Sequence, residues 1–118
     1  MPSLNISCFQ LSLAETDNLD KATNSIDTFF SKNQSTDLIV LSELAITGVN
    51  PDRKKSLDKF LPILKDLAKQ YDTWLIPGSF HEFEDEVIYN TCPVINNKGV
   101  LVTKARKLYP WLPYENQI

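Results

Sequence analysis

Apolar and polar positions in the first third of the chain predict two strands separated by a helix. Residues 4–11 begin with alternating apolar and polar side chains, a pattern typical of a half-buried strand. Between residues 18 and 32 apolar side chains recur every three or four positions, and Asp17 or Asn18 is available to cap this amphipathic helix. The apolar, β-branched run at residues 38–41 predicts a strand covered on both faces.

The middle of the chain repeats this alternation. Apolar side chains from Leu57 to Tyr71 recur at helical spacing, and Pro62 within this stretch favours a helix that begins near the proline. Residues 73–76 predict a third strand. The resulting β-α-β-α-β order indicates a parallel sheet and the α/β class. The acidic stretch at residues 82–86 is expected to form a loop.

The last regular pattern is a hairpin. Residues 87–95 and 100–105 flank Asn96-Asn97-Lys98-Gly99, a sequence typical of a turn between antiparallel strands. Residues 108–118 contain two prolines and have no periodicity of their own. Because the chain has 118 residues and no repeat or linker, one domain is expected.

Charge and hydropathy exclude several classes of partner. The net charge of -3 and the pI of about 5.0 offer no attraction to nucleic acid or anionic lipid. No segment approaches the roughly 20 apolar residues that a membrane helix needs, and the first eleven residues do not resemble a secretory signal. We therefore expect a cytoplasmic protein that binds neither nucleic acid nor membrane.

The cysteines and the histidine do not form a recognisable site. Cys8 and Cys92 lack a CxxC pair, which argues against a disulfide framework and a zinc site. Cys8 lies inside the first strand and is expected to be buried and inert. Cys92 lies within the hairpin, away from any helix N-terminus that would lower its pKa, so we do not interpret it as a nucleophile. The single histidine, His81, is expected to be exposed to solvent and to have no role.

Two charged residues are candidates for catalysis. Glu43 follows the strand at residues 38–41, and the carboxyl ends of parallel strands are where open α/β sheets place functional groups. Lys107 ends the hairpin beside an aromatic, proline-rich segment, where an ammonium group could stabilise an oxyanion. Considered separately, Glu43 is explained equally well as a solvated or capping residue, and Lys107 better as a surface residue.

Several motifs, in their order and separation, resemble the nitrilase superfamily of carbon-nitrogen hydrolases, most closely its amidase branch. They are residues 41–48, 77–79, 89–91 and 96–99, and Arg106-Lys107 followed by residues 110–115. The resemblance covers nearly the whole chain. Ser42 stands where the family usually has proline, which affects the approach to Glu43 more than its chemistry.

The resemblance implies a Glu-Lys-Cys triad that hydrolyses a small non-peptide amide, nitrile or carbamoyl compound. In it, Glu43 is the general base and Lys107 stabilises the tetrahedral oxyanion. Glu115, eight positions after Lys107, resembles a second glutamate that orients the substrate. Trp111 and Tyr114 are candidate walls of the pocket. No metal and no organic cofactor is implied.

The family's fold is an αββα sandwich, of which residues 1–118 are expected to be the N-terminal part. The family's cysteine follows its lysine by a few tens of residues, and no residue here matches it. We therefore expect one incomplete domain, inactive alone, that pairs with a C-terminal half or forms a homo-oligomer. A second hypothesis is a naturally short, non-catalytic homologue that acts as an interaction or regulatory module. A flavodoxin-like or nucleotide-binding domain is disfavoured, because residues 11–17 contain no glycine for a phosphate loop.

Overall fold

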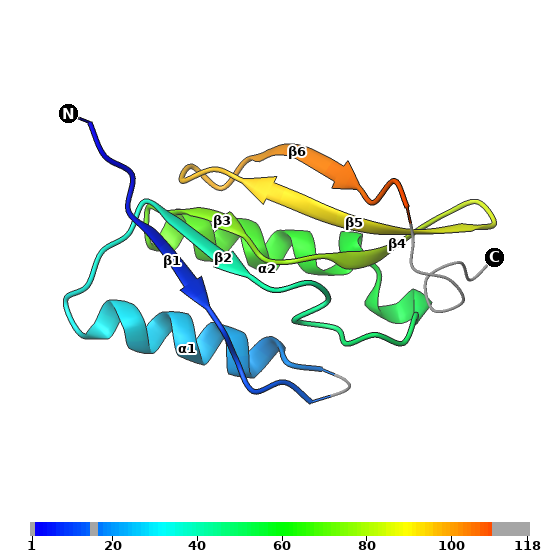
Figure 1. The fold of residues 1–118 in the computed structure, drawn as a ribbon, viewed down its shortest axis with the longest axis horizontal. Helices are drawn as coiled ribbons and strands as arrows, with labels where there is room; N and C mark the ends of the chain where they lie inside the picture. The colour runs from blue at the N-terminus through cyan, green and yellow to red at the C-terminus, as the bar shows by residue number, and fades with distance from the viewer. Residues whose placement is uncertain (1, 15–16, 110–118) are drawn as a thin grey trace.

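The computed structural model describes residues 2–14 and 17–109 of the protein. Within them, six strands form one sheet, accompanied by two α helices and a short 3-10 helix (Figure 1). In chain order the elements are β1 (Ile6–Phe9), α1 (Leu19–Ser31), β2 (Leu38–Leu41), η1 (Arg53–Lys55), α2 (Leu57–Gln70), β3 (Trp74–Ile76), β4 (Phe80–Glu84), β5 (Val87–Ile95) and β6 (Leu101–Arg106).

The sheet has a parallel half and an antiparallel half. β1, β2 and β3 pair in parallel, β5 pairs antiparallel with β3, and β4 and β6 each pair antiparallel with β5. The expected β-α-β-α-β order, the α/β class and the terminal hairpin are confirmed. Asn96 closes the hairpin, because its side-chain oxygen accepts hydrogen bonds from the N–H groups of Lys98 and Val100.

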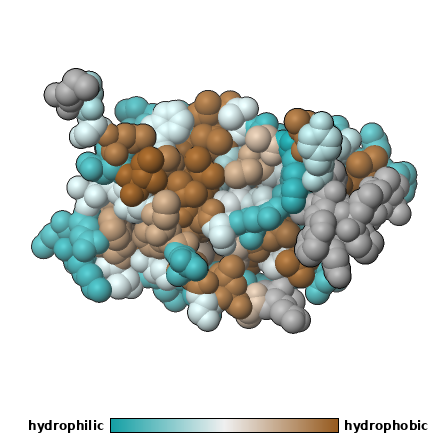
Figure 2. Space-filling model, in the orientation of Figure 1, coloured by the Kyte–Doolittle hydropathy of each residue, from teal (hydrophilic) through white to brown (hydrophobic). Residues whose placement is uncertain are grey.

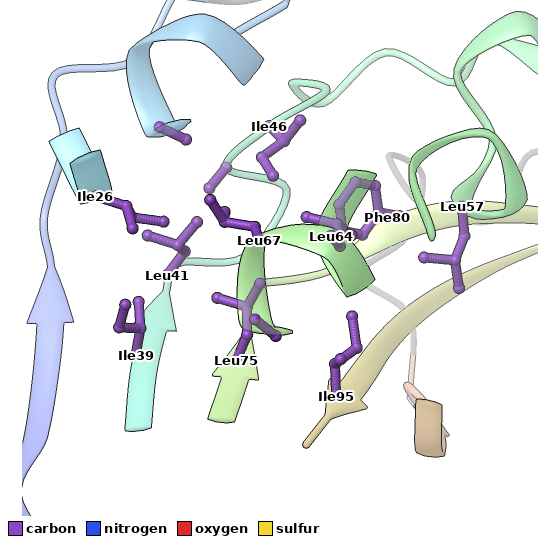
Figure 3. Close-up of a cluster of buried hydrophobic side chains, with 13 residues drawn as sticks. Ile26, Ile39, Leu41, Ile46, Leu57, Leu64, Leu67, Leu75, Phe80 and Ile95 are labelled. Atoms are coloured by element: carbon purple, nitrogen blue, oxygen red, sulfur yellow. The ribbon is translucent and has the colours of Figure 1, made fainter. Parts of the chain in front are cut away.

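Both helices contribute to one buried core (Figure 3). Ile39 and Leu41 of β2 and Leu75 of β3 point into this core, where they meet Ile26 of α1 and Leu64 of α2. Alternate residues of a strand face opposite sides of a sheet, so one face of the sheet is covered by the helices. The amphipathic patterns of the sequence supply the apolar stripes that make this packing favourable.

Figure 2 shows apolar side chains gathered over the parallel strands. Ile6 and Trp74 both lie beside Leu38 in the sheet, so they share one face of it. Ile39 and Leu75, one residue further along, point to the opposite face and are buried in the core. Ile6 is 53% exposed and Trp74 is 39% exposed. An apolar sheet face is therefore open in this chain. None of the helices within residues 2–14 and 17–109 is long and apolar enough to cross a bilayer.

The predicted start of the second helix is wrong. α2 begins at Leu57, not near Pro62, and the proline lies inside the helix. Leu57 is fully buried and Phe60 packs against Phe80, so the apolar face of the helix extends one turn before the proline. This burial offsets the loss of the proline's N–H donor.

The predicted acidic loop is also wrong. β4 covers Phe80 to Glu84, and only Asp85 and Glu86 form the turn before β5. Glu82 is compatible with a strand because Lys104 and Arg106, two strands away, neutralise its charge. These cations lie more than twenty residues later in the sequence, so the local pattern could not predict their effect.

Candidate active site

Glu43 leaves the sheet just beyond the carboxyl end of β2. Leu44, the next residue, has a positive φ of 51°, an uncommon conformation for a non-glycine residue. Its N–H group donates a buried hydrogen bond of 3.0 Å to Oγ of Ser79. Such strained backbone conformations cluster at functional sites, where surrounding contacts maintain them. Here the contact with Ser79 holds the sharp turn that directs Glu43 away from the strand.

Gly78 brings the end of β3 against the same turn. Its φ is +82°, and a Cβ atom at this position would lie 1.9 Å from the carbonyl oxygen of Ser42. Only glycine permits this backbone approach. The main chain of Ser42 therefore packs directly against Gly78.

The side chain of Lys107 extends from the end of β6 to Glu43. It follows the last residue of β6, and its N–H group donates to the carbonyl oxygen of Asn90 in β5 at 2.8 Å. Nζ of Lys107 lies 3.2 Å from Oε1 of Glu43, and Nδ2 of Asn90 donates to the same oxygen at 2.9 Å. The side chain of Glu43 is 55% exposed and that of Lys107 is 35% exposed. Glu43 and Lys107 therefore meet at one carboxylate oxygen.

These residues line a surface cleft of about 400 Å³. Leu41, Ile76 and Ala105 provide apolar surface within it. The charged pair thus lies beside a partly apolar surface, which is the usual composition of a small-molecule site. The lining residues are Leu41, Glu43, Ile76, Gly78, Ser79, Asn90, Cys92, Ala105, Arg106 and Lys107.

A second charged group anchors the strand that carries Lys107. The Glu82 carboxylate accepts hydrogen bonds from Lys104 at 2.5 Å and from Arg106 at 2.9 Å. It also accepts a 3.0 Å bond from the hydroxyl of Thr91, and its side chain is 14% exposed. Burial raises the pKa of Glu82, but the hydrogen bonds from Lys104, Arg106 and Thr91 outweigh it and hold the pKa below its usual value.

Arg106 extends this network. Its guanidinium group lies 3.7 Å from the centre of the Tyr89 ring and also pairs with Glu84. These contacts come from β4 and β5, so they fasten β6 to the rest of the sheet next to Lys107.

Two sequence-based expectations about single residues are wrong. Cys8 is exposed, because in β1 it alternates with Phe9 and points to the same open side of the sheet as Ile6. His81 is 4% exposed, and its Nε2 lies 3.1 Å from the carbonyl oxygen of Val49. The loop that follows Glu43 covers His81, which a local reading of the sequence could not reveal.

Cys92 lines the cleft that holds Glu43 and Lys107, a position that its place in the sequence did not indicate. The thiol is half-buried, and burial raises its pKa. A raised pKa disfavours the thiolate, the form that acts as a nucleophile. The structure therefore supports the expectation that Cys92 is not an activated cysteine.

The sequence matches the carbon-nitrogen hydrolase family over residues 5–117. The chain belongs to that family. It is 37% identical over 92 residues to a formamidase of Nitratidesulfovibrio vulgaris (strain DP4), a match covering 67% of this chain and 26% of the formamidase. The sequence-based expectation of a carbon-nitrogen hydrolase is thereby confirmed at the level of the family.

Two solved structures illustrate the fold of this carbon-nitrogen hydrolase chain. A Saccharomyces cerevisiae member of branch 10 of the nitrilase superfamily has a TM-score of 0.76 and 24% identity, covering 90% of this chain and 44% of its own. A carbon-nitrogen hydrolase from Helicobacter pylori G27 has a TM-score of 0.81 and 17% identity, and the match covers 96% of this chain and 42% of the Helicobacter pylori protein. The chain spans less than half the length of each of these relatives.

Some predicted site residues of the hydrolase chain have no structural description. Glu115, Trp111 and Tyr114 lie outside the described residues. Within residues 2–14 and 17–109, no three His, Cys, Asp or Glu side chains are grouped as metal ligands would be. Asn90 contacts Glu43 and Ser79 contacts Leu44 in the turn beside it, and no role was predicted for either residue. Their motifs, residues 89–91 and 77–79, were the only available signal.

Proposed function

We propose that the protein is a cytoplasmic carbon-nitrogen hydrolase of the amidase or nitrilase type, which acts on a small non-peptide amide, nitrile or carbamoyl compound. The proposal names Glu43 and Lys107 as members of a Glu-Lys-Cys triad. The 3.2 Å contact between their charged groups, inside a cleft, is the observation that carries it. The formamidase relative supports a small amide as the substrate class.

The proposed reaction begins with attack of a cysteine thiolate on the amide carbon. Glu43 takes the proton from the thiol, and Lys107 stabilises the negative charge that develops on the carbonyl oxygen. The proton then passes from Glu43 to the departing ammonia, leaving a thioester. Glu43 next activates a water molecule, which releases the carboxylic acid and restores the thiol. One amide and one water become one acid and one ammonia.

The cysteine of this triad is assigned to a segment beyond the 118 residues. Cys8 lies on β1 and is not among the residues that line the cleft, and burial raises the pKa of Cys92, so neither suits the role. Glu115 would orient the substrate, and Trp111 and Tyr114 would line the pocket. These assignments extend the family resemblance to residues outside the described part of the chain.

Pairing with further protein is part of the proposal. A general base works best when shielded from bulk water, whereas Glu43 is 55% exposed in this chain. The apolar sheet face that includes Ile6 and Trp74 lies open as well. Covering by a C-terminal half of the domain, or by a second copy of the protein, would bury the apolar face and enclose Glu43.

Release of ammonia from formamide, a short aliphatic amide, a nitrile and an N-carbamoyl compound tests the proposal. The full-length protein that carries these residues is the enzyme to assay. We expect Glu43→Gln and Lys107→Ala to lower kcat by about 10²-fold or more on the compound that is turned over. Glu84→Gln is the control, since Glu84 is exposed and lies outside the cleft. Folded Glu43→Gln protein that turns over substrate at the wild-type rate would refute the assignment.

The alternative function is a non-catalytic interaction or regulatory module. The open apolar sheet face favours it, because this surface could hold a partner without chemistry at Glu43. Size-exclusion chromatography with light scattering on the 118-residue chain tests this alternative. A stable, soluble monomer would count against a surface that requires a partner.

A further inference from the structure

Asn90 is linked to both charged residues of the proposed site. It lies in β5 opposite His81 of β4 and is 9% exposed. Its side chain contacts Glu43 and its main chain contacts Lys107. These two residues are 64 positions apart in the sequence, contact each other directly, and both bind this one asparagine.

The side-chain link determines which carboxylate oxygen of Glu43 is occupied. Nδ2 of Asn90 donates to Oε1 at 2.9 Å, and Nζ of Lys107 donates to the same oxygen. An ionised carboxylate only accepts hydrogen bonds, so the NH₂ group of the asparagine must face it. Oε1 thus receives two donors, while Oε2 of Glu43 has no hydrogen-bond partner among the described residues.

The main-chain link places Lys107. The carbonyl oxygen of Asn90 accepts from the N–H group of Lys107 at 2.8 Å, next to the pairing of Thr91 with Arg106. This bond continues the contact of β6 with β5 by one residue beyond the end of the strand. It fixes the backbone from which the Lys107 side chain extends toward Glu43.

We propose that Asn90 is a positioning residue, which holds Glu43 and Lys107 in one rigid unit and leaves Oε2 of Glu43 as the oxygen that exchanges the proton. The inference rests on the proposed hydrolase function. Catalysis by positioned groups loses about 100-fold in rate when a group moves by about 1 Å. A residue that constrains both the base and the cation therefore acts on the chemical step without touching the substrate.

A purely structural role is the competing explanation, because a nearly buried asparagine needs hydrogen bonds wherever it lies. A second hydrogen bond from an asparagine to a carboxylate, at an exposed position, is available for comparison. Nδ2 of Asn97 donates to Oδ1 of Asp72, also at 2.9 Å, in the turn at the far end of the hairpin. Asn97→Ala removes the same type of hydrogen bond at a site remote from Glu43.

The test uses the full-length protein with Asn90→Ala, Asn90→Leu and the control Asn97→Ala. Asn90→Leu approximately preserves the size of the side chain and removes the donor without adding a charge beside Glu43, so it remains informative if Asn90→Ala does not fold. Both Asn90 variants retain the main-chain bond to Lys107. Crystal structures should show the Glu43 carboxylate turned away from Lys107 Nζ, beyond hydrogen-bond distance, and Asn97→Ala should leave this contact unchanged.

Kinetics with formamide and short aliphatic amides give the second measurement. We expect both Asn90 variants to lower kcat by about 100-fold while KM changes by less than about two-fold. Loss of fold alone would instead reduce the amount of active enzyme and the melting temperature together. Folded Asn90 variants that keep both the Glu43–Lys107 contact and the wild-type kcat overturn the inference.

The experiments distinguish failure of the proposed function from failure of the role of Asn90. If Glu43→Gln and Lys107→Ala retain the wild-type rate, the proposed function is wrong. If those variants are inactive and the Asn90 variants are fully active, the hydrolase assignment stands and only the role of Asn90 is wrong.

Discussion

The ammonium group of Lys107 donates a 3.2 Å hydrogen bond to Oε1 of Glu43, a residue 64 positions earlier in the chain. β2 and β6 precede these residues, with β3 and β5 between them in the sheet. β6 runs antiparallel to β5, which runs antiparallel to β3, so β2, β3 and β6 end at the same edge. This topology brings the two charges together.

Replacement of Lys107 should affect the reaction more than the fold. We expect Lys107→Met in the full-length protein to lower kcat for amide hydrolysis by about 10²- to 10³-fold, because the variant loses a cation aimed at the oxyanion. Its long aliphatic side chain preserves contact with the cleft. Steady-state ammonia release, with the melting temperature measured in parallel, is the assay.

Lys104→Met is the matched control for this substitution. Lys104 is also near the end of β6 and also pairs with a glutamate, Glu82, but it does not line the cleft. We expect its kcat to remain within about three-fold of wild type. Equal losses of activity in both lysine variants would contradict a specific role for Lys107.

Gly78→Ala should disturb the turn that carries Glu43. The added Cβ would lie 1.9 Å from the Ser42 carbonyl oxygen, and alanine disfavours a φ of +82°. We expect the free energy of unfolding to fall by about 2 kcal/mol or more, with an additional loss of amidase activity. Urea denaturation and kinetics of the full-length variant measure the two effects.

Gly99→Ala separates backbone strain from damage to the site. Gly99 lies in the turn between β5 and β6 and has a φ of +78°. A Cβ added to it would lie 2.8 Å from the carbonyl oxygen of Lys65 in α2. This variant should also lose stability, but the folded protein should keep its kcat. If Gly99→Ala lowers kcat as much as Gly78→Ala does, the loss cannot be assigned to the turn at Glu43.

The Glu82 network should contribute stability that depends on pH. The pKa of Glu82 is lowered in the folded protein, so its contribution is present above the unfolded pKa and is lost as the pH falls through the folded value. We expect Glu82→Gln to reduce the free energy of unfolding at pH 7 by about 2 kcal/mol. The difference in the free energy of unfolding between wild type and Glu82→Gln should shrink as the pH falls from 5 to 3, because protonation of Glu82 removes the charge that the variant lacks.

Urea titrations at pH 7, 5, 4 and 3 follow this difference. Glu84→Gln provides the comparison, because Glu84 pairs with the same Arg106 but its side chain is 56% exposed. We expect less than about 1 kcal/mol from that variant at any pH. A Glu82→Gln difference that stays constant from pH 7 to pH 3 would exclude the ionised network as its source.

The two thiols should differ in reactivity in the 118-residue chain. Cys8 is exposed, whereas Cys92 is half-buried and its pKa is raised by burial. We expect a soluble disulfide reagent at pH 7 to modify Cys8 at least about ten times faster than Cys92. The rate for Cys92 should continue to rise above pH 9, since only the thiolate reacts.

Single-thiol proteins, Cys8→Ser and Cys92→Ser, assign each rate to its residue. Modification of Cys92 as fast as that of Cys8 would show that the cleft wall is more open or more activating than its burial indicates. In the full-length enzyme, Cys92→Ser should retain activity, because the proposal assigns the nucleophile to a different cysteine.

Local patterns predicted most of the regular elements. Alternation and helical spacing identified β1, α1, β2 and the final hairpin, because each depends on side chains close together in the sequence. The errors at Pro62 and at residues 82–86 have a shared cause. In both segments, contacts with distant residues, Phe80 for α2 and Arg106 for β4, outweigh the local preference.

The family motifs identified Glu43 and Lys107 as a pair, but the sequence contained no information on how they are held. Asn90 and Ser79 act through hydrogen bonds that cross from one strand end to another. The burial of His81 beneath the loop containing Val49 is of the same kind. Such contacts depend on strand order and register, which a single sequence does not reveal.

The sequence by itself determined the β-α-β-α-β order, the final hairpin, the α/β class and the resemblance that pairs Glu43 with Lys107, because these are properties of neighbouring residues and of motif order. Only the tertiary structure decided that both side chains meet at one carboxylate oxygen, with Asn90 between them. The physical reason is range: periodicity reports on a few successive residues, whereas hydrogen bonds at the site join strands brought together by the burial of the whole core.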